Sequence, residues 1–204
     1  MYISSLRFKQ ICFEDEQRVH QMLSDCFDSK REKYSVLYKK YFAMNNGIPV
    51  QMLLVYSDVE PVPSEDIEVL KSMAVEPEKA ICNGRALKFT MTVAPTVHRA
   101  DRHVCIRNYK DRCEWVRKQL GKYGAEIFSN YLVEGKKESI VFSHKYDQTP
   151  GVITAYQYTG ILRVTDAEKF ISLFENGLGR GKAYGCGLIQ LQPCNGEKCI
   201  NFRN

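Results

Sequence analysis

The chain has no hydrophobic run of the length that a membrane-spanning helix needs. Such a helix takes roughly 18 or more consecutive apolar residues, and every apolar stretch of this sequence is interrupted well before that length. Arg7 and Lys9 break up the apolar residues near the start, so no secretory signal core forms there. We therefore expect a cytoplasmic protein with no membrane partner.

The sequence also lacks the spacings of common metal sites. Its eight cysteines include no C-x-x-C pair, and there is no H-E-x-x-H motif. In the absence of an export signal, free thiols in a reducing compartment explain the cysteines better than a disulfide framework does. The sequence thus predicts neither a metal nor any other cofactor.

What is present is the composition of a folded, basic protein. The 204 residues are 44% hydrophobic and 26% charged, which excludes wholesale disorder, and the length allows one large domain or two small ones. Residues 1–95 carry 12 Lys and Arg against 13 Asp and Glu, whereas residues 96–204 carry 17 against 11. Most of the excess lies in residues 99–122. Such a segment attracts polyanions, although a charge run can also be only a solvated helix face.

The first half of the chain has the pattern β-α-β-β-α-β. Apolar residues recur at helical spacing from Val19 to Phe27, and Asp15 can cap the N-terminus of that helix. The sequence Asn45-Asn46-Gly47 is typical of a turn between two strands. The expected elements are a strand at 2–9, a helix from residue 15, a hairpin of 34–44 and 48–57, a weaker helix over 65–80 and a strand at 86–94.

The second half repeats this order. The helix expected from Tyr109 to Tyr123 is strongly amphipathic, and the one at 166–176 stops at Gly177. The other expected elements are strands at 103–107, 127–133, 139–145, 153–165 and 188–191, with a basic hairpin tip at 134–137 and a bulge at Gly160. Both halves match the ferredoxin-like motif. We therefore expect an α+β fold of two tandem ferredoxin-like (RRM-like) domains, residues 1–95 and residues 96–204.

The segment Gly177–Gly187 holds five of the 13 glycines of the chain. Glycine lets backbone N–H groups approach an anion closely, and Arg180 and Lys182 add positive charge. The segment is no Walker A loop, because Ala183 replaces the Ser or Thr of that motif, and it follows a helix rather than the strand of a dinucleotide fingerprint. The segment indicates contact with a polyanion, or else a tight helix-to-strand turn.

This loop, read from Gly177 to Leu188 with Pro193 after it, resembles the C-terminal glycine-rich motif of the RAMP superfamily. More narrowly, the chain resembles the CasE family, the repeat-processing endoribonucleases of type I-E CRISPR systems. Met1-Tyr2-Ile3-Ser4, Val19-His20-Gln21 and the helix segment Trp115–Gly121 carry the resemblance through the rest of the chain. The tail Cys194–Asn204 has no counterpart in the family.

The resemblance implies metal-independent cleavage of CRISPR precursor RNA at the 3′ base of the repeat hairpin, with a 2′,3′-cyclic phosphate product. It implies that His20 is the catalytic residue. It also implies that the mature guide RNA stays bound and that the protein is a subunit of the type I-E surveillance complex. The residues expected to contact RNA are Arg99, Arg102, Arg107, Lys110, Arg112, Lys136, Lys137, Gly179, Arg180, Gly181 and Lys182.

A single histidine without a metal is compatible with RNA cleavage, because RNA carries its own nucleophile in the 2′-hydroxyl. An imidazole has an ordinary pKa of about 6.5 and can exchange protons at neutral pH. On sequence grounds alone, His20 lies at the margin of an apolar helix face and could be an ordinary boundary residue. If His20 is catalytic, the fold must bring its side chain next to the glycine-rich loop.

One position departs from the family pattern. Relatives commonly have a Tyr one helical turn before the histidine, where this chain has Gln17. A basic residue just after the helix (Lys30, Arg31 or Lys33) could take over that role, or the protein could bind RNA without cleaving it. A third hypothesis is a ferredoxin-like protein that binds a small phosphorylated ligand in the glycine-rich loop.

Overall fold

The computed structural model describes residues 1–10, 15–27, 35–100, 102–144 and 147–194, without the side chains of 129, 130 and 143–150. Its elements, in chain order, are β1 (Tyr2–Phe8), α1 (Glu16–Ser24), β2 (Val36–Asn45), β3 (Ile48–Ser57), β4 (Ile67–Ala74), α2 (Pro77–Ala80), β5 (Ala86–Val93), β6 (Thr96–Arg99), β7 (Arg102–Cys105), α3 (Tyr109–Lys122), β8 (Ala125–His144), β9 (Asp147–Val164), α4 (Ala167–Asn176), the 3-10 turn η2 (Lys182–Tyr184) and β10 (Ile189–Pro193). No helix in the described part of the chain is long and apolar enough to cross a membrane.

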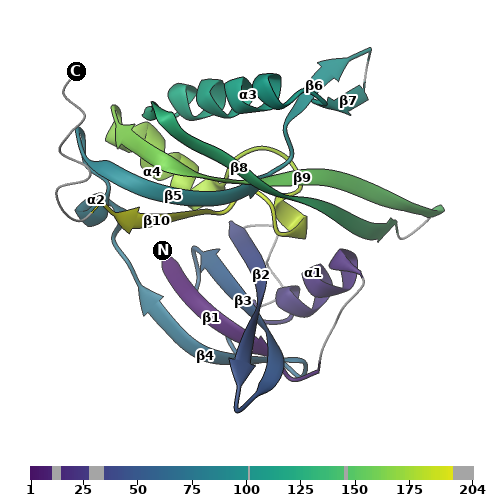
Figure 1. Ribbon diagram of the computed structural model, residues 1–204. Helices are drawn as coiled ribbons and strands as arrows, with labels where there is room; N and C mark the ends of the chain where they lie inside the picture. Colours follow the sequence, from purple (N-terminus) through teal and green to yellow (C-terminus); the bar gives the residue numbers. More distant parts are fainter. Residues whose placement is uncertain (11–14, 28–34, 101, 145–146, 195–204) are drawn as a thin grey trace.

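The N-terminal sheet is antiparallel, in the order β2-β3-β1-β4 (Figure 1). Helix α1 begins as expected, because the carboxylate of Asp15 accepts a hydrogen bond from the backbone N–H of Gln17 at 2.9 Å. Its buried side chains, among them Val19 and Leu23, pack on one face of this sheet. The predicted hairpin is confirmed: Asn46 and Gly47 both have positive φ, as the tight turn between β2 and β3 requires.

The helix predicted over residues 65–80 is wrong, since half of that stretch forms strand β4 and only the short helix α2 follows it. This strand pairs antiparallel with the whole length of β1, from Tyr2 opposite Ala74 to Phe8 opposite Ile67. Pairing with a strand about 60 residues earlier outweighs the weak local helical pattern. The N-terminal domain therefore has the sheet order of a ferredoxin-like domain with α1 as its only full-length helix among the described residues.

The second sheet is also antiparallel, in the order β10-β5-β9-β8, and it is covered by α3 and α4 (Figure 1). The core of this domain buries Val116 and Leu120 of α3 and Phe170 and Leu173 of α4 against β5, β8 and β9. The helix predicted at 166–176 and its stop at Gly177, whose φ is 71°, are confirmed. Strands and helices follow the ferredoxin-like order, so the chain has the expected fold of two tandem ferredoxin-like domains, of which the first has only the short helix α2 in place of its second helix.

Strand β5 belongs to this second sheet, so the expectation that residues 86–94 close the first domain is wrong. Its partners are β9 and β10. A boundary between the domains within residues 75–85 suits this pairing better than one at residue 95. Among the described residues, β6 and β7 pair only with each other, and they form a separate two-stranded sheet that follows β5 and precedes α3 in the chain.

The hairpin predicted at residues 134–137 is wrong as well. Strand β8 runs through this stretch without a turn and pairs with β9, with register shifts that include one between Glu134 and Lys137. A second irregularity, between Ile127 and Leu132, lies beside Gly160, where an added Cβ would stand 2.4 Å from the carbonyl oxygen of Tyr131. The bulge therefore occurs near Gly160 as expected, but the extra residues are in β8.

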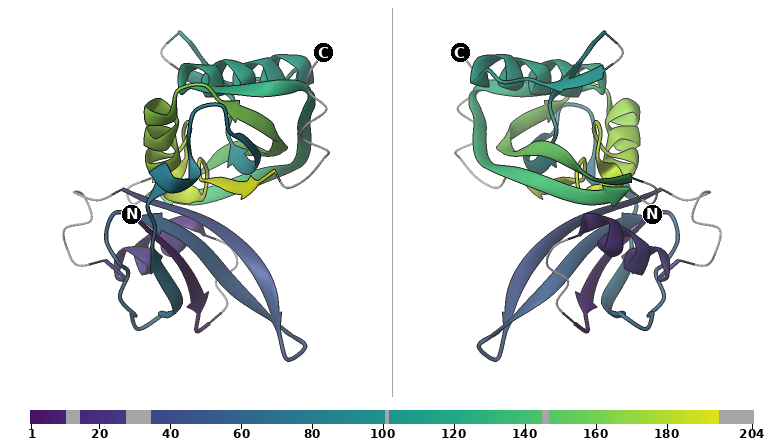
Figure 2. Two further views of the ribbon diagram at one scale, coloured as in Figure 1. Left: turned by 90° about the vertical axis from the view of Figure 1, so that its left-hand side faces the viewer. Right: turned by 90° about the vertical axis from the view of Figure 1, so that its right-hand side faces the viewer.

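The two domains lie against each other (Figure 2), and side chains of both pack together across their boundary. Leu37 of β2 and Tyr56 of β3 are buried in the same core cluster as the side chains of the second domain. The ring of Tyr56 lies 5.0 Å from that of Phe174, centroid to centroid. Burial raises the pKa of Tyr56 to about 12. These contacts fix α1 and the glycine-rich loop relative to each other.

Candidate functional site

Helix α1 presents His20 towards the second domain. The imidazole is half-buried, and its helix is anchored by apolar neighbours in the core of the first domain. The ring centroid of His20 lies 6.2 Å from that of Tyr184, with an interplanar angle of 54°. Tyr184 belongs to η2, inside the glycine-rich loop. The structure therefore brings together the two features that the sequence analysis expected to converge.

Tyr184 connects the two domains through its hydroxyl and its ring. The hydroxyl donates a hydrogen bond to Oε1 of Gln17 at 3.2 Å. The ring stacks on Phe142 of β8, with centroids 4.3 Å apart and planes 16° from parallel. Burial, and then the negative charge of Asp15, raise the pKa of the Tyr184 phenol above its usual value. The phenol is therefore a neutral donor at physiological pH.

The glycines give the loop its shape. Gly181 and Gly185, which flank η2, have φ angles of 78° and 79°, in the left-handed region that glycine adopts without steric cost. The N–H groups of Tyr184 and Cys186 both donate to the carbonyl oxygen of Gly181, at 2.9 and 3.1 Å. The loop is tied to the first domain where the hydroxyl of Tyr38 donates to the carbonyl oxygen of Ala183 at 3.2 Å.

The positive groups of the loop differ in what they can reach. Lys182 donates from Nζ to the carbonyl oxygen of Asn176 at 3.0 Å, at the C-terminal end of α4. Arg180 is exposed, and its backbone N–H, like those of Gly179 and Gly181, has no partner among the described residues. Three successive N–H groups beside a guanidinium can receive an anion.

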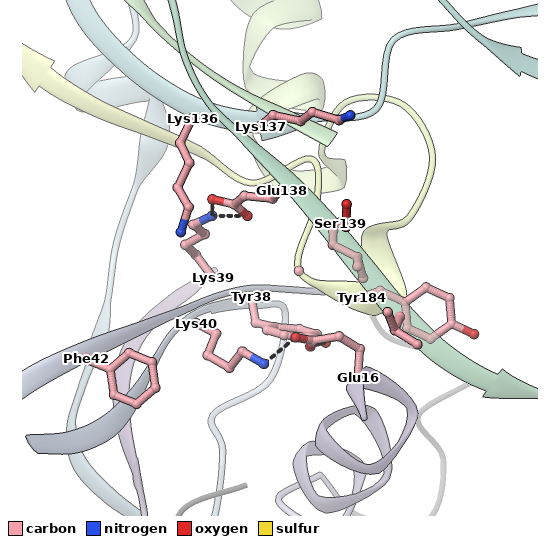
Figure 3. Close-up of a pocket in the computed structure, with 13 residues that line it drawn as sticks. Glu16, Tyr38, Lys39, Lys40, Phe42, Lys136, Lys137, Glu138, Ser139 and Tyr184 are labelled. Atoms are coloured by element: carbon pink, nitrogen blue, oxygen red, sulfur yellow. Dashed lines mark hydrogen bonds and ion pairs between the residues drawn. The ribbon is translucent and has the colours of Figure 1, made fainter. Parts of the chain in front are cut away.

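A cleft of about 560 Å³ lies between β2 of the first domain and β8 of the second, next to Tyr184 (Figure 3). Lys39 donates to Thr92 at 2.8 Å and forms an ion pair with Glu138 at 3.2 Å. Figure 3 shows a second ion pair, between Lys40 and Glu16, and shows Lys136 and Lys137 leaving β8 in different directions. Lys136 and Lys137 therefore line an interdomain cleft and not a hairpin tip.

A second hollow, of about 650 Å³, leads from Tyr184 to the β6–β7 hairpin. Its lining includes Arg180 and Tyr184 of the loop, Phe142 of β8 and His103 of β7. Desolvation, followed by the positive charges of Arg180 and His98, lowers the pKa of His103. Arg99 and Arg102 on the hairpin, and Arg107 and Lys110 at the start of α3, are exposed. Arg180 and His103 share this hollow, Arg99 pairs with Arg102 on the hairpin, and Arg99 and Arg107 line a neighbouring hollow; these residues and Lys110 are called the basic strip below.

Arg112 does not belong to this strip. Its guanidinium forms an ion pair with Glu134 at 2.5 Å, and the two side chains are only 9% and 8% exposed. It also lies over the ring of Tyr156, 4.1 Å from the centroid. Burial alone would raise the pKa of Glu134, but hydrogen bonds from Arg112 and Tyr158 outweigh it and lower that pKa. We therefore assign Arg112 a structural role rather than contact with RNA.

Sequence reasoning missed Tyr184 and Phe142. The available signal for Tyr184 was an aromatic residue among the glycines of the loop, but nothing local indicated that Phe142 would stack on it. Lys30, Arg31 and Lys33, suggested as helpers of His20, lie outside the described residues. Within the described part of the chain, no group of three or more His, Cys, Asp or Glu side chains is placed to hold a metal ion.

Comparison with known proteins shows which family this chain belongs to. The family model described as "CRISPR associated protein" matches residues 1–193. Solved structures with the same fold include the CRISPR endoribonuclease Cse3 bound to a 19-nucleotide RNA (TM-score 0.80, 19% identity, covering 95% of this chain and 100% of that one). A Thermus thermophilus Cse3, bound to an RNA that represents a pre-cleavage complex, matches with a TM-score of 0.80 and 18% identity over 94% of this chain and 98% of that one.

Cas6e from Escherichia coli K-12 matches with a TM-score of 0.71 and 24% identity over 95% of this chain and all of that one. A chain of a CRISPR RNA-guided surveillance complex matches with a TM-score of 0.69 and 14% identity, again over 95% of this chain and all of that one. No curated protein sequence matches. At these identities the structural matches establish the fold, and the family model covers nearly the whole sequence. The chain belongs to the CRISPR-associated protein family that this model describes.

Proposed function

We propose that the protein is a metal-independent endoribonuclease that cleaves CRISPR precursor RNA at the 3′ base of the repeat hairpin. The observation that carries the proposal is the meeting of His20, on the first helix, with Tyr184 in the glycine-rich loop at a ring separation of 6.2 Å. Membership of the family, and the RNA-bound Cse3 relatives, support RNA as the substrate.

In the proposed reaction, the 2′-hydroxyl attacks the adjacent phosphorus and the bond to the 5′ oxygen breaks. The products are a 2′,3′-cyclic phosphate and a 5′-hydroxyl, so one proton leaves the 2′ oxygen and one reaches the 5′ oxygen. His20 exchanges a proton in this step, a contribution that is typically worth about 10²–10⁴-fold in rate. The N–H groups of Gly179 to Gly181 and the charge of Arg180 stabilise the additional negative charge on the phosphate.

The basic strip would hold the repeat hairpin. A-form RNA has a deep, narrow major groove and a wide, shallow minor groove, so its recognition relies largely on backbone contacts and shape. Exposed cations on β6–β7 and α3, such as Arg99 and Arg102, suit phosphate contacts. The guide RNA would then stay bound, with the protein as a subunit of a surveillance complex. The similarity to a chain of such a complex supports this part of the proposal.

A second candidate is an RNA-binding subunit that does not cleave. Two observations favour it. Gln17 carries no titratable group, and Lys182 donates to the end of α4 rather than into the site. This candidate predicts tight binding of the hairpin with no product, even after long incubation at saturating protein.

The deciding experiment is incubation of the purified protein with its repeat RNA in excess EDTA, followed by analysis of the product ends. Cyclic phosphate ends are expected. The variant His20→Ala should lose cleavage while its Kd for RNA stays within a few-fold of that of the wild type. Gln21→Ala, an exposed change on the same helix, is the matched control and should cleave normally. Equal cleavage by His20→Ala would remove His20 from the mechanism.

A further inference from the structure

Tyr184 is held in place by several elements. Its hydroxyl donates to Gln17 of α1 at 3.2 Å, and its ring stacks on Phe142 of β8 at 4.3 Å. The preceding carbonyl, of Ala183, accepts a hydrogen bond from Tyr38 of β2 at 3.2 Å. Tyr184 is half-buried, and its contacts and that of Ala183 come from three different elements. The position of the phenol is therefore set by α1 and β8 as well as by its own loop.

The phenol is directed to the surface of α1 that also carries the imidazole. Gln17 precedes His20 by three residues, so the two side chains lie on the same helical face. The ring of Tyr184 lies 6.2 Å from that of His20 and is inclined to it by 54°. A phosphate placed against His20 would therefore lie within reach of the Tyr184 hydroxyl.

The hydrogen bond to Gln17 is one that a phosphate could replace. Burial and the charge of Asp15 raise the pKa of the Tyr184 phenol, so its hydroxyl retains the proton that it donates. The amide oxygen of Gln17 is a neutral acceptor, whereas a phosphate oxygen is charged. Hydrogen bonds to ionised acceptors are roughly twice as strong as those between neutral groups. The hydroxyl would thus favour the phosphate when RNA is bound.

We propose that Tyr184 is a second catalytic residue of this site, whose hydroxyl leaves Gln17 and donates a hydrogen bond to a non-bridging oxygen of the phosphate on which His20 acts. The inference rests on the proposed function. Tyr184 stabilises charge and transfers no proton, so the protons of the 2′ and 5′ oxygens move as described above. Gln17 is a positioning residue, because it keeps the phenol in place until RNA binds.

The test is Tyr184→Phe, which keeps the ring and its stacking on Phe142 and removes only the hydroxyl. Single-turnover cleavage at saturating protein should slow by about 10- to 100-fold, the range expected for one donor to a charged oxygen. The Kd for RNA should stay within about twofold, since Tyr184 acts on a single phosphate. Tyr123→Phe, at an exposed tyrosine beyond the end of α3, is the matched control and should leave both values unchanged.

Phosphorothioate RNA separates this role from a merely structural one. Sulfur accepts hydrogen bonds poorly, so one of the two diastereomers at the scissile phosphate should slow the wild type more than the other. That difference should become smaller in Tyr184→Phe, because the contribution of the phenol hydroxyl is lost while that of the loop N–H groups and Arg180 remains. Wild-type cleavage that is lost in His20→Ala but unchanged in Tyr184→Phe would overturn this inference alone. A Tyr184→Phe variant that slows but keeps the full diastereomer difference would also overturn it. Absence of wild-type cleavage would overturn the proposed function, and this inference with it.

Discussion

The hydroxyl of Tyr184 lies 3.2 Å from Oε1 of Gln17, although 167 positions separate the two residues in the chain. The contact joins α1 to the glycine-rich loop. It depends on the packing of the two domains, in which Leu37 and Tyr56 of the first domain are buried in the core of the second. A site assembled in this way forms only when both domains are folded and docked.

Gly185→Ala tests how the loop places Tyr184. Gly185 has a φ of 79°, and an added Cβ would lie 3.2 Å from Cε2 of Tyr38. A non-glycine residue in this conformation costs about 1–3 kcal/mol. The chain is expected to relieve that strain by moving Tyr184 away from His20. Cleavage should therefore fall more than RNA affinity does, as measured by single-turnover kinetics and by titration with RNA.

Gly121→Ala is the control for this change. Gly121 lies in α3, and an added Cβ there has nothing within 4 Å apart from its own helix and chain neighbours. Alanine should leave cleavage unchanged and can stabilise the helix by up to about 1 kcal/mol. If both variants cleave like the wild type, the conformation of Gly185 does not control the site.

Arg112→Ala should change the stability of the protein, whereas Arg102→Ala should change its binding of RNA. Arg112 is paired with Glu134 at 2.5 Å, with both side chains less than a tenth exposed. Its loss leaves a buried, unpaired carboxylate, and breaking such a pair costs about 3–5 kcal/mol. Chemical denaturation should show this loss in the free energy of unfolding. The slope of log Kd for RNA against log salt should remain the same as in the wild type.

Arg102 is exposed on β7, so its removal should change the free energy of unfolding by less than about 0.5 kcal/mol. If Arg102 contacts one phosphate, Arg102→Ala should reduce the slope of log Kd against log salt by about 1. A small phosphorylated ligand as the natural partner would give a shallow slope in every variant. If Arg112→Ala lost more RNA affinity than Arg102→Ala, the assignment of Arg112 to the core would be contradicted.

Local patterns predicted the elements whose causes are local. The cap at Asp15, the turn at Asn46 and Gly47, and the stop at Gly177 each depend on a few neighbouring residues, and each was confirmed. Strand β4 was missed because its stability comes from pairing with β1, far away in the chain. The hairpin placed at residues 134–137 was wrong because pairing with β9 carries β8 straight through a basic, glycine-containing stretch.

The same distinction applies to the site. The charge run predicted the exposed arginines of β6 and β7, but it could not separate them from Arg112. Arg112 is paired with Glu134, which lies 22 positions later in the chain, on β8. The resemblance to a known family singled out His20. The contacts of Tyr184 with Gln17 and Phe142 join three separate segments, so only the folded chain makes them visible.

His103 should make RNA binding depend on pH. Desolvation and the charges of Arg180 and His98 lower its pKa, so His103 is mostly neutral at pH 7.5 in the free protein. Phosphates beside it would favour the protonated form and raise its pKa in the complex. Binding would then take up a proton, so affinity should increase as the pH falls from 7.5 towards 5.5. Each unit by which binding raises the pKa can contribute up to about tenfold in affinity.

The measurement is the Kd for repeat RNA between pH 5.5 and 8 at constant ionic strength, with His20→Ala as the background to prevent cleavage. Adding His103→Gln should flatten the pH dependence and weaken binding mainly at low pH. Adding Arg102→Gln instead should weaken binding by the same factor at each pH, because an arginine stays charged throughout this range. A pH dependence that survives unchanged in the His103→Gln variant would mean that His103 does not lie beside phosphate in the complex.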